Sequence, residues 1–192
     1  GAGLSLILSI VHEAGASRCT TDGLRLRPLS VDELFHYGQA NTDAAPITTV
    51  QPSGPTTCLS SQSPFIAAKA ANMPALLARQ EITAPNGLFV MLPQQHLLFY
   101  APADPNNISA QLHSLVDFVR FPIIDAQTNN PHRALSRDIF YYSPDGTLDA
   151  ITRADDPDVQ ELLSNPHISS TNYHVSVQKY LSPAFEQRFF SH

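Results

Sequence analysis

Three residues have side chains that enzymes use as nucleophiles or bases, namely Cys58, His96 and His132. Cys58 lies in the segment TTCLS, directly after a Gly-Pro pair. A cysteine paired with a histidine, and with an aspartate as third member, would suit a hydrolase in which the imidazole takes up the thiol proton. The alternative for Cys58, which we favour, is a small apolar residue that enters a strand or loop.

The histidines and carboxylates do not have the spacing of a known metal motif. Eight histidines are present, but no two stand at i and i+4 on an expected helix, and none lies beside a cysteine. The aspartates between positions 145 and 158 lack the glycine and the closing glutamate of an EF-hand. Neither a nucleophile elbow nor a phosphate-binding glycine loop occurs. We therefore predict no metal site and no cofactor.

Three further residues are candidates for a contact surface: Arg137, Tyr141 and Tyr142. Arginine and tyrosine are favoured at the energetic centres of protein interfaces. Successive side chains of a strand point to opposite faces, so one tyrosine should be buried and the other exposed. These positions make binding of another protein a testable hypothesis.

The central segment 87–100 reads GLFVMLPQQHLLFY. It predicts a β-hairpin around which the candidate residues are arranged. Its two apolar runs are of strand length, and they are separated by a short polar stretch that begins with Pro93. Because proline cannot donate a backbone hydrogen bond, we expect Pro93 in the turn and not in the sheet. Apolar residues on both faces predict a strand that is covered on both sides. A buried helix broken at Pro93 is the alternative.

Helices and a second hairpin are expected around that centre. Ser30 and Glu33 form a capping-box pattern that predicts a helix to about position 41, burying Leu34, Phe35 and Tyr37. The sequence also predicts a helix from position 63 that is divided at its second proline, an amphipathic helix from 108 to 119, and a hairpin at 140–151. The stretch 43–55 is long for a loop and could conceal a strand.

Length and composition suit a single α+β domain over 1–192, with 1–20 and 153–192 as flanking elements. We predict an antiparallel or mixed β-sheet with helices packed on it and the hairpin at about 88–100 in its centre. The net charge is −6 and the basic residues form no run, which disfavours nucleic acid as a partner. No apolar segment is long enough for a membrane span. Two cysteines make no disulfide framework, so we expect free thiols and a cytoplasmic location.

Three segments resemble one family. They are the expected helix 29–41 followed by Ala45-Pro46, the central segment 87–99, and the stretch 134–148 that contains the second hairpin. In this order they resemble the YtpQ-like family of uncharacterised bacterial proteins, over residues of about 25–152. The pairing of alanine and asparagine at Ala40-Asn41 departs from the family spacing. The resemblance implies no catalytic residue, because none is established for the family.

Two functions of different classes follow from these patterns. The leading hypothesis is a non-catalytic domain that binds another protein or forms a homo-oligomer, because strands and turns are well specified whereas no catalytic constellation is. The alternative is a hydrolase or metal-dependent enzyme in which His, Asp and Cys58 converge. A small-ligand pocket between the sheet and a helix is a third hypothesis.

Overall fold

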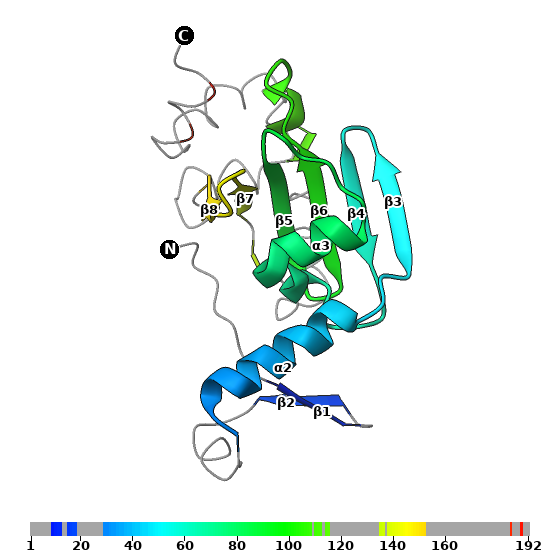
Figure 1. Cartoon of the computed structure of the whole chain (residues 1–192). Helices are drawn as coiled ribbons and strands as arrows, with labels where there is room; N and C mark the ends of the chain where they lie inside the picture. Colours follow the sequence, from blue (N-terminus) through cyan, green and yellow to red (C-terminus); the bar gives the residue numbers. More distant parts are fainter. Residues whose placement is uncertain are drawn as a thin grey trace.

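A six-stranded antiparallel sheet is the centre of the molecule (Figure 1). The computed structural model describes residues 9–12, 15–18, 29–108, 110–112, 114–115, 135–136, 138–152, 185 and 189. The strands of the sheet follow the order β3-β4-β6-β5-β7-β8, with bounds Thr49–Ser53, Thr56–Ser60, Leu97–Pro102, Leu88–Gln94, Ile139–Tyr142 and Leu148–Ala150. A separate hairpin pairs β1 (Ser9–His12) with β2 (Gly15–Arg18). The sheet is open, and the fold is α+β.

The predicted central hairpin is confirmed. Strands β5 and β6 pair antiparallel from Leu88 opposite Pro102 to Gln94 opposite Leu97, and they are the two middle strands of the sheet. The first six residues of β5 are all buried. Such a strand needs cover on both faces, because its apolar side chains alternate between them.

Two hydrophobic clusters provide that cover, one on each face of the sheet. One cluster lies on the face of the sheet that residues 66–76 cover, and we call it the helix-side cluster. It comprises Leu59, Ile66, Ala67, Ala70, Met73, Leu76, Leu88, Val90, Leu92, Leu98 and Phe140. The opposite cluster comprises Phe89, Met91, Ala101, Ala103, Ile108, Leu112, Leu115, Ile139, Tyr141, Ile151 and Phe185. Alternate residues of β5 enter alternate clusters, as the period of a strand requires.

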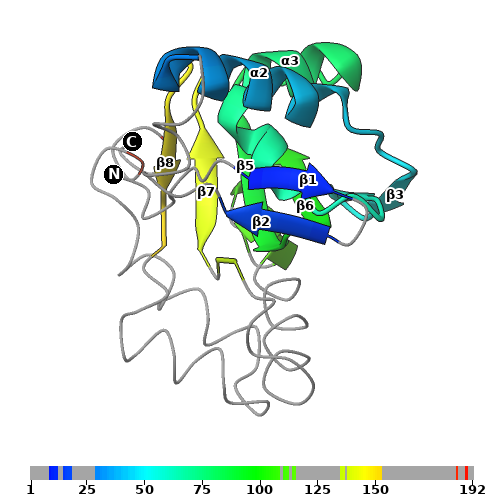
Figure 2. The ribbon, with the colours of Figure 1, turned by 90° about the horizontal axis from the view of Figure 1, so that it is seen from below.

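Three helical segments lie on the helix side. They are α2 (Val31–Ala44), the 3-10 helix η1 (Ala67–Asn72) and α3 (Met73–Arg79). The last crosses in front of β5 and β6 in Figure 1, and Figure 2 shows that α2 and α3 share one side of the sheet. Pro74 stands in the first turn of α3, so the predicted division of this helical region at a proline is confirmed. Within the described residues, no helix combines the length and apolar character needed to cross a bilayer.

The expectation that Pro93 lies in the turn is wrong. Pro93 is a buried residue of β5, and the turn consists of Gln95 and His96. The register between β5 and β6 shifts between Met91 and Gln94, so that Pro93 sits in a bulge where the ladder needs no donor from it. Its carbonyl still accepts a hydrogen bond of 2.9 Å from the backbone amide of Leu135.

Helix α2 begins as predicted but buries less than predicted. Ser30 Oγ accepts from the Glu33 amide at 3.2 Å, and the Ser30 amide donates to Glu33 Oε2 at 2.8 Å. These hydrogen bonds, led by that of the Ser30 side chain, lower the pKa of the Glu33 carboxyl. No residue of α2 is buried, and Tyr37 is 56% exposed and Phe35 38% exposed. The predicted burial of these two side chains is wrong, and Leu34 is only half-buried, because α2 extends past the end of the sheet (Figure 1).

Other elements agree with the predictions where they are described. Strand β3 is the strand concealed in the stretch 43–55, and it is the exposed edge of the sheet. Residues 108, 110–112, 114 and 115 are helical, with Ile108, Leu112 and Leu115 buried. The hairpin of β7 and β8 turns through residues 143–146. The later part of the helix predicted to 119 lies outside the described residues.

A buried hydroxyl offers a first prediction. Thr56 is 1% exposed, and its Oγ1 has no hydrogen-bond partner among the described residues. A buried hydroxyl without a partner keeps its full desolvation cost. Thr56→Val replaces it with a methyl group of similar size, so we expect urea denaturation to give a gain of about 1 kcal/mol. Thr57→Val, at a half-buried neighbour on the opposite face, should change the stability by less than half of that.

Candidate functional site

Cys58 lies in β4, half-buried, opposite Gln51 of β3 and Phe99 of β6. Burial raises the pKa of its thiol above the ordinary value. A nucleophilic cysteine needs the opposite shift, because the thiolate is the reactive form. The environment of Cys58 therefore suits a packed thiol in the sheet.

His96 does not meet Cys58. It lies in the turn between β5 and β6, and its Nδ1 is 3.1 Å from the carbonyl oxygen of Ser63. Cys58 is opposite Phe99, three residues further along β6, which corresponds to about 10 Å of extended strand. His132 lies outside the described residues. No group of three or more His, Cys, Asp or Glu side chains suited to a metal occurs in the described part of the chain.

The two tyrosines proposed as contact residues lie on opposite faces of β7. Tyr141 is 6% exposed in the opposite cluster, and its hydroxyl donates to the carbonyl oxygen of Asn86 at 2.6 Å. Its ring also contacts that of Phe185, with 5.3 Å between the ring centroids. Tyr142 is half-buried against the helix-side cluster. The burial of one tyrosine is confirmed, and this tyrosine has a structural role; Arg137 lies outside the described residues.

The state of Cys58 gives a second prediction. At pH 8 we expect iodoacetamide to alkylate Cys58 at least about ten times more slowly in the folded protein than in urea, because burial limits both access and thiolate formation. Mass spectrometry of the peptide that contains Cys58 measures this rate separately from that of Cys19. An alkylation rate in the folded protein equal to that in urea would contradict the assignment of a packed thiol.

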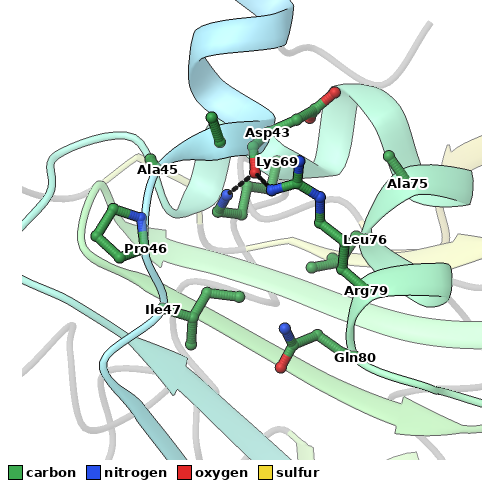
Figure 3. Close-up of a pocket in the computed structure, with 10 residues that line it drawn as sticks. Asp43, Ala45, Pro46, Ile47, Lys69, Ala75, Leu76, Arg79 and Gln80 are labelled. Atoms are coloured by element: carbon green, nitrogen blue, oxygen red, sulfur yellow. Dashed lines mark hydrogen bonds between the residues drawn. The ribbon is translucent and has the colours of Figure 1, made fainter.

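The cavity of greatest chemical interest lies where α2 ends against α3 (Figure 3). It has a volume of about 150 Å³. Two cationic side chains, Lys69 of η1 and Arg79 of α3, line one part of it. One acidic residue, one amide and six apolar residues line the rest, namely Asp43, Gln80, Ala44, Ala45, Pro46, Ile47, Ala75 and Leu76. We call this cavity the α2-end pocket.

Both cations hydrogen-bond to the last carbonyl groups of α2. Lys69 Nζ donates to the carbonyl oxygens of Thr42 at 2.7 Å and Asp43 at 3.0 Å, and Arg79 Nη1 also donates to that of Asp43. Carbonyls in the last turn of a helix lack most of their intrahelical partners, although that of Thr42 also accepts from the Ala45 amide at 3.2 Å. The helix dipole places partial negative charge at this end. The last turn of α2 contains no basic residue. Residues from η1 and α3 therefore cap the helix from outside.

The carboxylate of Asp43 is held by amides and not by the two cations. Its Oδ1 accepts from Gln39 Nε2 at 2.8 Å, and its Oδ2 accepts from Asn72 Nδ2 at 2.6 Å. Asn72 also caps α3, because its side-chain oxygen accepts from the Ala75 amide at 3.4 Å. The side chains thus tie the end of α2 to the start of α3 and fix the walls of the pocket.

Lys69 is only 4% exposed. Burial lowers the pKa of its ammonium group, the positive charge of Arg79 lowers it further, and the negative charge of Asp43 acts in the opposite direction. Sequence reasoning missed this residue. Its signal was a single lysine within AAKAAN, because a cation in a row of small residues facing a core needs a specific partner.

A second candidate surface lies at the other end of α2. Val31 and Phe35 are one helical turn apart, 50% and 38% exposed, and Leu29 precedes them with similar exposure. Leu34 and Gly38 fall on the same side of the helix and are half-buried. We call Val31, Leu34, Phe35 and Gly38 the α2 stripe.

No family model matches the chain, and the comparisons with curated proteins and with solved structures likewise find no match.

Proposed function

We propose that the chain is a non-catalytic domain that self-associates through the α2 stripe. One observation supports this proposal above all. A helix of 14 residues with a cap at its start has no buried residue, while large apolar side chains on it remain exposed. Helices in folded domains gain most of their stability from packing an apolar face, so an uncovered one is a candidate for contact with another chain.

A second copy of the chain is the partner that the charges favour. The first turn of α2 contains Asp32 and Glu33 and its last turn contains no basic residue, but Lys69 and Arg79 lie at its far end. Antiparallel pairing of two α2 helices would bring the acidic start of each towards the cationic end of the other, and it would align the helix dipoles favourably. In a two-fold dimer the same stripe serves both copies.

The stripe is small, so the association should be weak. A helix of 14 residues is about 21 Å long, and one face of it offers far less than the roughly 800 Å² per partner of a stable interface. We therefore expect a dimer that forms at high micromolar concentration and dissociates on dilution.

Light scattering and sedimentation over a concentration series test this proposal as its third prediction. The average mass of the wild type should rise towards that of a dimer, and Phe35→Asp should weaken dimerisation at least about tenfold, because a carboxylate would be buried in an apolar contact. Ala40→Asp is the matched control, since Ala40 is exposed on the opposite side of α2. It adds the same charge to the same helix and should leave dimerisation within about twofold.

Two outcomes would overturn the proposal. The first is a strictly monomeric wild type throughout the series. The second is an equal effect of the two substitutions, which would mean that charge and not the stripe governs association. Circular dichroism of both variants checks that α2 still forms.

Membership of the YtpQ-like family and a cytoplasmic location stay predictions. They are supported by the three similar segments within 25–152 and by the use of only two cysteines. The catalytic alternative has no support in the described residues, where Cys58 and His96 lie apart.

A further inference from the structure

The cations of the α2-end pocket have hydrogen-bonding capacity left over. An ammonium group has three donors and a guanidinium has five. Lys69 uses two of them, and Arg79 uses one. In the described part of the chain, neither side chain forms an ion pair with a carboxylate, and the oxygens of Asp43 accept from Gln39 and Asn72 instead. The remaining donors are therefore available for a ligand.

The charge of the pocket points to an anion. Lys69 and Arg79 contribute two positive charges, against one negative charge of Asp43 and about half a negative charge from the end of α2. A nearly buried ammonium normally has a carboxylate or phosphate partner. Lys69 has carbonyl partners only, and the neighbouring guanidinium repels it. An anion between the two cations would relieve that repulsion.

The size and the apolar wall narrow the ligand class. A cavity of about 150 Å³ holds a molecule of roughly six non-hydrogen atoms. Pro46, Ile47 and Leu76 are the largest residues of the apolar part of the wall, and Figure 3 shows Ile47 and Leu76 beside the region between the cations and Gln80. A carboxylate with a short aliphatic tail matches both parts, whereas an inorganic anion matches only the cations.

We propose that the α2-end pocket binds a short-chain aliphatic monocarboxylate, with Arg79 and Lys69 on the carboxylate and with Ile47 and Leu76 against the tail. This site lies at the opposite end of α2 from the stripe and forms within one copy of the chain, but the proposed antiparallel dimer would bring the acidic start of a second α2 towards the same two cations. Arg79 is exposed, so it can be changed without burying a new group. It is the residue through which the site is tested.

The test is a titration of isotope-labelled full-length protein with butyrate, followed by amide chemical shifts at constant sodium concentration. We expect saturable shifts at Ile47, Lys69 and Arg79 in the millimolar range, which is within reach of a ligand this small. Butyramide has the same size without the charge, and phosphate has the charge without the tail. Both should bind at least about tenfold more weakly.

Arg79→Gln should weaken butyrate about tenfold, while Arg79→Lys keeps the charge and should stay within about threefold. Glu81→Gln, two residues away and outside the pocket lining, changes the local charge by one unit in the opposite direction and should not weaken butyrate binding. Equal binding of butyramide, phosphate as strong as butyrate, or an absence of saturable shifts at tens of millimolar would overturn the proposal. Dimerisation measured in the same samples keeps the outcome separate from that of the α2 stripe.

Discussion

Gly87→Ala should destabilise the domain by about 3 kcal/mol, although the substitution removes no side-chain interaction. Gly87 is buried and directly precedes β5, with a φ of +89°. A Cβ at this position would lie 2.5 Å from the hydroxyl oxygen of Tyr141 and 2.6 Å from two of its ring carbons. Such distances are far inside van der Waals contact, so the ring or the backbone must shift.

Neither neighbour can shift cheaply. The Tyr141 hydroxyl donates to the Asn86 carbonyl, and its ring is packed in the opposite cluster. The backbone of Gly87 is fixed on both sides, because its amide donates to the Ala84 carbonyl and its carbonyl accepts from the Ala103 amide, both at 3.0 Å. The expected cost therefore combines strain at positive φ with overpacking in a closed core.

Gly146→Ala is the matched control. Gly146 has a φ of +93°, almost the same as Gly87, but its Cβ would meet only Tyr142 Oη at an ordinary 3.9 Å. We expect about 1 to 2 kcal/mol there from backbone strain alone. Urea denaturation of both variants measures the difference, which isolates the contact with Tyr141. Equal losses at the two positions would show that crowding at Gly87 contributes nothing.

The sheet was predictable because its strands have strong local patterns. The apolar runs of β5 and β6 are uninterrupted and of strand length, and the segment Ser143 to Gly146 has the residues that a turn needs. Pro93 was misplaced because its tolerance depends on a bulge, which is set by pairing between strands and not by local sequence. The prediction that α2 is buried was wrong for a related reason. Periodicity in the sequence predicts which face of a helix is apolar, but it does not predict what packs against that face.

The α2-end pocket could not have been derived from the sequence. It brings together Asp43, Lys69 and Arg79. Lys69 follows Asp43 by 26 positions in the sequence, and Arg79 follows it by 36. None of the three belongs to a motif, and their meeting depends on how η1 and α3 fold back against the end of α2. For the hypothesis of a catalytic cysteine and histidine the situation is reversed, because the sequence suggested residues that the fold does not bring together. Cys58 and His96 are chemically suitable residue types, but the register of β4 and β6 keeps them apart.

Phe89→Ala should cost about 3 to 5 kcal/mol, the usual range for a large side chain removed from a closed core. Phe89 is fully buried in the central strand β5. Its ring centroid lies 5.7 Å from that of Tyr141 and 5.8 Å from that of Phe185. Phe35→Ala is the control, because Phe35 is 38% exposed on α2 and should cost less than about 1 kcal/mol.

The same substitution tests whether residue 185 belongs to the core in solution. Phe185 is 3% exposed and contacts both Phe89 and Tyr141, although it follows β8 by more than thirty positions. If this contact stabilises the fold, the losses from Phe89→Ala and Phe185→Ala should not add, and the double-mutant cycle should give a coupling of about 1 kcal/mol. Additive losses would mean that the two rings act independently. A negligible loss for Phe185→Ala alone would remove the C-terminal aromatic residues from the core and leave Phe89 and Tyr141 to close this face of the sheet.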